Sequence, residues 1–285
     1  METQDTSLEL LRSLLAMAWF VEARDPYTGG HLWRVSRFSR LVAERAGMDE
    51  RWAARAMVGG FLHDLGKIGV PDAILRKPDR LTDDEYEVIK THPDLGARLL
   101  SGHPMAELVV DAVRLHHERP DGLGYPLGLQ LDRIPKISAI VSVCDAFDAM
   151  TSHRPYRAGM PEAKALEIIK SEMGRQFHSV YAQALLDLGQ AGELRHVIGH
   201  SEQGIPLYRC TQCGPTLVLT AKSKEQDRIF CRNCASEYIV VEQAGGLGVE
   251  PTGHMGQPFD LLPELDIGQI EATLSGAQAS LSLLL

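Results

Sequence analysis

The chain has 285 residues and a formal charge of −9, with 44% hydrophobic and 24% charged residues. This length allows one sizeable domain and a smaller one. The acidic balance argues against a protein that coats nucleic acid, because phosphate binding requires a basic surface. A small anionic substrate stays compatible with it, because metal ions can invert the field locally.

Neither a targeting signal nor a membrane span is expected. Met1 to Asp5 lacks the cationic start and the apolar core of a signal peptide. No apolar run reaches the roughly 18 residues that a span requires. Four of the five cysteines fall in two Cys-x-x-Cys pairs, which suits metal binding in a reducing compartment better than disulfides. We therefore expect a cytoplasmic protein.

Helical periodicity dominates the chain up to about residue 190. Helices are predicted over residues 7–22, 30–46, 50–64, 72–75, 82–92, 96–100, 105–117, 136–150, 161–173 and 180–188. Arg34 is placed on the polar face of the second helix. Thr82 and Glu85 form a capping box. Helix 136–150 is apolar nearly all round and is therefore expected to be buried, although Asp145 interrupts its apolar face.

A histidine and an aspartate stand side by side at the expected end of the third helix. Apolar residues flank His63 and Asp64, so both are expected to be buried, where an ionised carboxylate without a partner is costly. The simplest explanation is a cation between them. A single His-Asp pair is more often a structural pair in a core, so the other candidate ligands decide the question.

Five imidazoles and two carboxylates form a candidate ligand set, namely His31, His63, His92, His116, His117, Asp64 and Asp145. This nitrogen and oxygen set suits iron or manganese, and less selectively zinc. The adjacent His116-His117 before a glycine-rich loop, and Asp145 inside an apolar helix, favour a metal site over scattered structural histidines. One cation cannot use seven ligands, whereas two cations that share a carboxylate can, which indicates a two-metal hydrolytic centre.

Three blocks of the sequence resemble those of one family. His63-Asp64-Leu65-Gly66-Lys67 is similar to the signature of HD-domain phosphohydrolases. The run from His116 to Pro126, with its Gly124-Tyr125-Pro126, resembles the extended motif that names the HD-GYP family. The runs Asp145 to Ser152 and Arg154 to Arg157 are similar to that family's later block. The resemblance covers about residues 7–190 and implies a mainly α fold, an all-helical HD-type bundle.

The resemblance also implies metal-dependent hydrolysis of cyclic di-GMP, a bacterial second messenger, or of a related cyclic dinucleotide. A hydroxide that bridges two metals would yield the linear dinucleotide pGpG, and in some members GMP. By motif, one metal would be held by His31, His63, Asp64 and Asp145, and the other by Asp64, His92, His116 and His117. Lys67 would act with Asp64 at the scissile phosphate, and substrate contacts would come from Arg154, Arg157, Tyr125 and Asp148.

One departure from the family pattern bears on the number of metals. Members with a third metal carry a glutamate four residues before the first ligand histidine, and this chain has Tyr27 there. A phenol is a poor ligand at neutral pH, because it must first lose a proton with a pKa of about 10. We therefore expect two divalent transition ions, iron or manganese, rather than three.

Four cysteines predict a second metal site. The pairs Cys210-Cys213 and Cys231-Cys234 are separated by residues 214–230, a spacing typical of a structural zinc site. We expect one zinc ion in a small β-rich, zinc-ribbon-like module over residues 205–243, because so short a stretch cannot build a core alone. The helical catalytic part would span residues 7–199. A Gly- and Pro-containing tail, either mobile or with a partner-binding terminal helix, would span residues 244–285.

Two other functions remain open. The chain could be a catalytically weak member that acts as a signalling adapter and binds a protein partner through the ribbon and the tail, although the complete ligand set disfavours this. It could also be an HD-type phosphohydrolase that acts on other nucleotides, which the intact Gly124-Tyr125-Pro126 disfavours. The sequence leaves the preferred metal and the oligomeric state, a dimer included, undecided.

Overall fold

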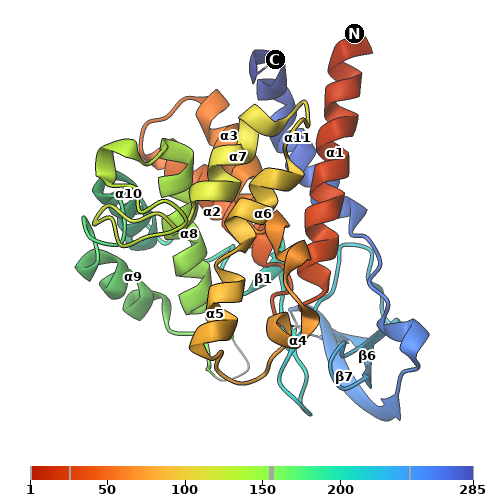
Figure 1. Cartoon of the computed structure of the whole chain (residues 1–285). Coiled ribbons are helices and arrows are strands. Elements are labelled where there is room, and N and C mark those ends of the chain that lie inside the picture. The colour runs from red at the N-terminus through yellow and green to blue at the C-terminus, as the bar shows by residue number, and fades with distance from the viewer. Residues whose placement is uncertain (1, 26, 154–156, 244, 285) are drawn as a thin grey trace.

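The protein is a bundle of helices with a small β region beside the end of its first helix (Figure 1). The computed structural model describes residues 2–25, 27–153, 157–243 and 245–284. The helices are α1 (Glu2–Ala23), α2 (His31–Arg45), α3 (Glu50–Leu62), α4 (Asp72–Leu75), α5 (Asp83–Ile89), α6 (His92–Leu99), α7 (Ala106–Leu115), α8 (Lys136–Thr151), α9 (Glu162–Ser171), α10 (Ser179–Gln190) and α11 (Ile267–Leu284). The strands are β1 (His200–Glu202), β2 (Ile205–Pro206), β3 (Tyr208–Arg209), β4 (Thr216–Leu217), β5 (Arg228–Phe230), β6 (Ser236–Gln243) and β7 (Gly246–Met255). Three 3-10 turns are η1 (Leu65–Gly69), η2 (Leu131–Arg133) and η3 (Pro258–Leu261).

Two apolar clusters hold the helices together. In the first, α2 and α8 meet through Phe38 and Phe147, whose ring centroids lie 5.3 Å apart in an edge-to-face contact, and α9 and α10 cover this pair. In the second, α1, α3, α7 and α11 pack around residues such as Leu15 and Phe61. Helix α3 contributes to both clusters and ends at Leu62. The residues that follow it therefore lie where the two cores meet.

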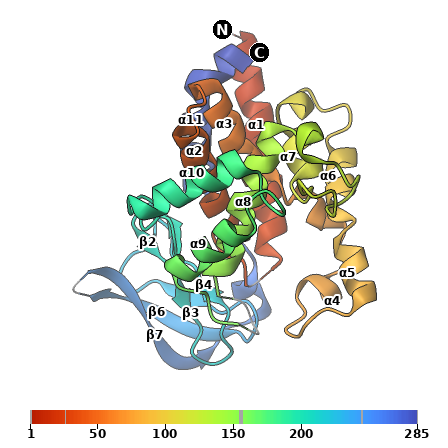
Figure 2. The same ribbon diagram turned by 90° about the vertical axis from the view of Figure 1, so that its left-hand side faces the viewer.

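The expected helices form largely as the periodicity predicted. The capping box at the start of α5 is present, because Thr82 Oγ1 accepts from the Glu85 amide at 3.3 Å and Glu85 Oε2 accepts from the Thr82 amide at 2.7 Å. Helix α8 is buried at the centre of the bundle (Figure 2). The predicted fold class, an all-helical bundle followed by a small β-rich four-cysteine region, is confirmed.

The β region extends beyond the predicted module of residues 205–243. Strands β5, β6 and β7 form one antiparallel sheet, in which Val240 of β6 faces Val249 of β7. The sequence predicts a tail over the residues of β7, because their Gly and Pro content does not alternate as a strand does. Pairing with β6 supplies the backbone hydrogen bonds that local propensity does not predict.

The terminal helix α11 returns to the bundle. Ile270, Leu274 and Ala277 are at most 4% exposed and pack into the cluster with α1 and α3. Arg40 of α2 donates to the Gly276 carbonyl at 3.0 Å. The predicted tail is thus not a separate unit in the described structure, and its buried face is not available to a partner. The first turns of α1 and the last turns of α11 lie at the same end of the molecule (Figures 1 and 2). None of the helices in the described ranges has both the length and the apolar content of a membrane span.

Candidate metal centre

The structure gathers all seven predicted ligand residues into one cluster between the helices. They come from five places in the chain: the first residue of α2 (His31), the junction of α3 and η1 (His63 and Asp64), the first residue of α6 (His92), the end of α7 (His116 and His117), and the interior of α8 (Asp145). Helix ends contribute most of them, because side chains at helix ends can reach a point that lies between packed helices.

The first group of donor atoms surrounds one point. The Nε2 atoms of His31 and His63 lie 3.3 Å apart, and Asp64 Oδ2 is 3.5 Å from each of them. Asp145 Oδ1 lies 3.5 Å from His31 Nε2 and 3.8 Å from His63 Nε2. Two nitrogens and two carboxylate oxygens at such spacing form a set that could hold one divalent ion.

The second group lies on the other side of Asp64. The Nε2 atoms of His92 and His116 are 3.2 Å apart, and a ring nitrogen of His117 lies within 4.8 Å of both. Asp64 Oδ1 is 3.4 Å from His92 Nε2, whereas Oδ2 faces the first group. The two oxygens of one carboxylate therefore point to different imidazole groups, as a ligand shared by two ions would.

Backbone carbonyls orient three of the imidazoles. His63 Nδ1 donates to the Gly60 carbonyl at 2.8 Å, and His92 Nδ1 donates to the Ile89 carbonyl at 2.8 Å. His116 Nδ1 donates to the Ala112 carbonyl at 2.9 Å. A carbonyl can only accept, so the proton lies on Nδ1 and the lone pair of Nε2 is directed at the centre.

Burial keeps most of these imidazoles neutral. It lowers the pKa of His92 and of His116 to about 4, and it also lowers the pKa of His63 and of His117. For His31 burial again lowers the pKa, but hydrogen bonds to Asp148 and Asp64 outweigh it and raise the pKa to about 9.

Asp64 remains ionised in spite of its burial. Desolvation raises the pKa of this carboxyl, but the charge of Lys67 and the neighbouring imidazoles hold the pKa well below its usual value. Lys67 Nζ lies 2.6 Å from Asp64 Oδ2, and the Lys67 side chain is 24% exposed. The lysine predicted to act at the phosphate therefore lies beside the shared carboxylate, at the edge of the cluster.

Asp148, predicted among the substrate contacts, lies beneath the cluster instead. It is 1% exposed, and its Oδ2 accepts from His31 Nδ1 at 2.8 Å. Its Oδ1 and Oδ2 also accept from Nε and Nη2 of Arg34, at 2.6 and 3.1 Å. The substrate role is therefore incompatible with this position, and Asp148 positions the His31 ring.

Arg34, predicted on the polar face of its helix, is also buried, at 2% exposure. Beyond its pair with Asp148, its Nη1 donates to the His200 carbonyl of β1 at 3.0 Å. The sequence contained an indication of this pair. Arg34 follows His31 by three residues and Asp148 follows Asp145 by three, so each pair shares a helix face, and the two faces meet.

The Gly-Tyr-Pro loop packs directly against the second imidazole group. The Tyr125 ring stacks on His117 with centroids 4.6 Å apart. A Cβ on Gly124 would lie 2.4 Å from the Arg119 amide nitrogen, so only glycine allows this approach. Glu118 is 1% exposed and accepts from the amides of residues 127 and 129, each at 2.7 Å. This role of Glu118 was not predicted from the sequence, although the residue directly follows the histidine pair.

Two arginines were predicted to contact phosphate. Arg157 donates to the carbonyls of Met150 and Ala149, at 3.2 and 2.5 Å, and so caps the end of α8. Arg154 lies outside the described residues. The observed contacts of Arg157 therefore explain it as a helix-capping side chain.

The four cysteines converge in the β region, as their spacing predicted. The Sγ atoms of Cys210 and Cys234 are 3.5 Å apart, and Cys213 Sγ lies 3.7 Å from that of Cys210 and 3.6 Å from that of Cys231. All four fall within 4.8 Å of one another. Four thiols at this spacing form a tetrahedral set of the kind that closes around zinc.

Comparison with known proteins gives one family match and several relatives. A family model described as "HD domain" matches residues 16–179. A "Cyclic di-GMP phosphodiesterase" of Thermotoga maritima is 40% identical over 189 residues, which are 66% of this chain and 50% of the relative. The "Cyclic di-GMP phosphodiesterase response regulator RpfG" of Xanthomonas campestris is 42% identical over 176 residues, which are 61% of this chain and 47% of the relative.

A third relative acts on a different nucleotide according to its name. It is the "3'3'-cGAMP-specific phosphodiesterase 3" of Vibrio cholerae, 36% identical over 172 residues, which are 59% of this chain and 36% of the relative. The chain spans half the length of these curated relatives or less. The part of the chain that the family model matches, residues 16–179, contains the histidine cluster.

Proposed function

Because the chain belongs to the HD domain family, as its motifs predicted, we propose that it is an HD-GYP-type phosphodiesterase that hydrolyses cyclic di-GMP or a related cyclic dinucleotide. The product would be the linear dinucleotide pGpG, with GMP as a further product. The observation that carries this proposal is the division of the Asp64 oxygens between two imidazole groups. A shared carboxylate would hold two ions close enough to act together on the attacking and leaving oxygens of a phosphodiester.

We assign one ion to the first group and one to the second. His31, His63 and Asp145 would bind the first ion, His92, His116 and His117 would bind the second, and Asp64 would bind both. Their nitrogen and oxygen donors fit iron or manganese. When bound, the two ions would supply Lewis-acid charge and make a water acidic at neutral pH.

The protein's own groups would then bind and orient the substrate. Lys67, 2.6 Å from Asp64 Oδ2, would turn its ammonium toward a phosphate oxygen once an ion neutralises that carboxylate. One face of the Tyr125 ring stacks on His117, and the other face would form a wall of the substrate site. The Lys90 ammonium lies 5.5 Å from the centroid of this ring. Arg154 stays a candidate phosphate contact, whereas the position of Asp148 excludes it from this role.

Two ions rather than three are supported by the environment of Tyr27. Burial raises the pKa of this phenol further above its usual value, so it stays protonated at neutral pH. In the β region we propose one structural zinc ion bound by the four cysteines. The expected cytoplasmic location and a dimer stay predictions.

Incubation of the purified protein with cyclic di-GMP tests the proposal. With iron or manganese under anaerobic conditions, chromatography should detect pGpG, and elemental analysis should count about two transition ions and one zinc per chain. Asp64→Ala should abolish turnover and deplete the transition ions but not the zinc. Asp132→Ala removes an exposed carboxylate from η2 and should change neither the turnover nor the metal content.

One result would refute the assignment of the centre, and a second would identify the substrate among the related cyclic dinucleotides. Full turnover in Asp64→Ala would show that the cluster is not the catalytic centre. Hydrolysis of cyclic GMP-AMP with no cleavage of cyclic di-GMP would leave the centre intact and change the substrate. The comparison of both dinucleotides therefore separates the site from its specificity.

A further inference from the structure

The guanidinium group of Arg24, which directly follows the end of α1, is fully engaged with one short segment of the chain. Its Nη1 donates to the carbonyls of Lys67 and Ile68, at 3.1 and 3.0 Å. Its Nη2 donates to the Val70 carbonyl at 2.8 Å and to Asp72 Oδ1 at 2.6 Å, and its Nε donates to the same Asp72 oxygen at 3.0 Å. All five N–H groups of this side chain therefore have acceptors in that segment.

The segment consists of the turn η1 and the residues directly after it. Packing fixes the turn on both sides of its exposed part: the Gly66 backbone lies so close to the His92 carbonyl that a Cβ would overlap it, and Val70 is 1% exposed. Ile68, between them, is 50% exposed. The last carbonyls of a helical turn have no partner within it, and a basic side chain can supply one. Arg24 does so at the residues that packing leaves uncovered.

The same turn places the Lys67 ammonium at the edge of the metal cluster. The Lys67 amide donates to the Asp64 carbonyl at 2.9 Å, and its Nζ lies 2.6 Å from Asp64 Oδ2. The Lys67 carbonyl accepts from the Val70 amide at 3.0 Å as well as from Arg24. Hydrogen bonds thus fix the Lys67 backbone at both its amide and its carbonyl, and the orientation of this backbone decides where the ammonium lies.

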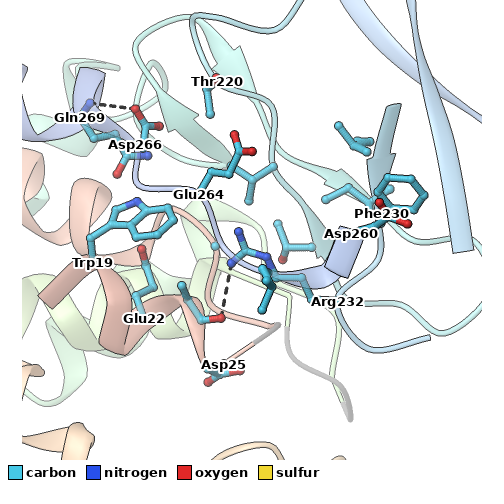
Figure 3. A pocket seen from close by; sticks show the side chains of 18 of the residues that line it. Trp19, Glu22, Asp25, Thr220, Phe230, Arg232, Asp260, Glu264, Asp266 and Gln269 are labelled. Atoms are coloured by element: carbon cyan, nitrogen blue, oxygen red, sulfur yellow. Dashed lines mark hydrogen bonds between the residues drawn. The ribbon is translucent and has the colours of Figure 1, made fainter. Parts of the chain in front are cut away.

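The end of α1, from which Arg24 extends, is anchored by the β region. Arg232 Nη1 donates at 3.4 Å to the carbonyl of Ala23, the last residue of α1. The Arg232 guanidinium also lies 5.9 Å from the centroid of the Trp19 ring, and both side chains line the cavity shown in Figure 3. Arg24 therefore connects η1 to a helix end that is itself held in place.

We propose that Arg24 is a positioning residue for phosphodiester hydrolysis and acts through Lys67, by fixing the turn from which the ammonium reaches a phosphate oxygen. A direct phosphate contact is not its role, because its five N–H groups are all engaged. A lysine has three donors and no planar fork, so it could not replace all of these contacts. This inference rests on the proposed function, in which Lys67 meets the scissile phosphate.

Amide hydrogen exchange on the full chain with its metals bound tests the contact without substrate. In Arg24→Gln the amides of Lys67 and Val70 should exchange several-fold faster than in wild type, because the turn loses the donors that hold its carbonyls. Arg12→Gln is the matched control on the same helix, because it removes a 2.9 Å pair with Glu271 far from the turn and should leave this exchange unchanged. Elemental analysis should find the wild-type content of transition ions in both variants.

A double-mutant cycle tests the catalytic consequence. Arg24→Gln should lower kcat for cyclic di-GMP about 10- to 100-fold, because a small displacement of a group at the reacting phosphate is that costly. In a Lys67→Ala background the same change should alter kcat less than about twofold, since no ammonium is left to position. A general loss of stability would instead lower kcat equally in both backgrounds. Arg24→Lys keeps the charge without the fork and should recover only part of the loss.

Two further measurements keep the test decisive. If Lys67→Ala has no measurable turnover, dissociation constants for pGpG complete the same cycle, because the product phosphate would meet the same ammonium. Arg24→Gln should then weaken pGpG binding with Lys67 present and leave it unchanged in Lys67→Ala. If Arg24→Gln does not fold, Arg24→Lys takes its place in both experiments, with a smaller effect in the same direction.

Three outcomes would overturn the proposal: unchanged exchange of the turn, unchanged kcat, or an equal loss of kcat or of pGpG affinity in both Lys67 backgrounds. Loss of the transition ions from Arg24→Gln would place its effect on Asp64 and would overturn the proposal as well. A wild-type protein that cleaves no cyclic dinucleotide would refute the proposed function alone, because the exchange is measured without substrate.

Discussion

Replacing Asp148 by asparagine tests how a buried ion pair supports the candidate metal centre. The carboxylate is 1% exposed and accepts from Arg34 Nε at 2.6 Å and from His31 Nδ1 at 2.8 Å. Asparagine keeps the volume but loses the charge, so the guanidinium of Arg34 is left buried without a counter-ion. The new amide NH₂ must also face one of these donors, because both carboxylate oxygens are in use.

Two magnitudes follow from this geometry. Removing one member of a buried ion pair costs about 3–5 kcal/mol. For a protein of this size about 2–4 °C of Tm is lost per kcal/mol, so Tm should fall by roughly 6–20 °C. The His31 ring also loses the acceptor that orients it, which should reduce metal affinity about 10- to 100-fold.

Thermal unfolding of Asp148→Asn and wild type, with and without metal, measures the first effect, and elemental analysis after dialysis measures the second. Ser152→Ala is the matched control, because it removes the hydrogen bonds of the Ser152 hydroxyl from Arg34 Nη2 at 3.2 Å and to Asp148 Oδ2 at 3.3 Å but leaves the ion pair intact. It should lower Tm by no more than a few degrees. A Tm of Asp148→Asn within about 2 °C of wild type, with unchanged metal content, would refute the reasoning.

The remaining predictions concern pH, the Gly-Tyr-Pro loop and the cysteines. Burial raises the pKa of Asp148, but Arg34 and His31 lower this pKa far more. The ionised Asp148 carboxylate therefore stabilises the folded protein fully above the unfolded pKa of about 3.9, and this stabilisation is lost as pH falls below that value. Denaturant titrations should show a constant difference in unfolding free energy between wild type and Asp148→Asn from about pH 5 to pH 6, and this difference should shrink below pH 4. A difference that stays constant down to pH 3 would contradict this reasoning. Gly124→Ala, whose methyl would meet backbone atoms at 2.4 Å, should cost about 1–3 kcal/mol of unfolding free energy and most of the turnover, whereas Gly245→Ala, with nothing within 4 Å, should cost neither. Cys231→Ser should remove the zinc detected by elemental analysis, Cys144→Ala should retain it, and zinc retained in the first variant would exclude the four-cysteine site.

The candidate ligands could be predicted because their chemistry is visible in short segments. His63 and Asp64 stand next to each other among apolar residues, and Asp145 interrupts an apolar helix, so each is conspicuous without any knowledge of the fold. The roles of Asp148 and Arg34 could not be predicted in the same way. Their pairing joins residues 114 positions apart, and helix periodicity alone assigned Arg34 to a solvent-facing side.

The sequence by itself determined the helices, the identity of the histidine, aspartate and cysteine donors, and the family, since periodicity and motif spacing are local properties of the chain. Only the tertiary structure decided which oxygen of Asp64 faces which imidazole group, that β7 joins the ribbon sheet, and that α11 completes the bundle. Such features depend on packing between distant segments, where side-chain volume and backbone pairing outweigh the preferences of any single stretch.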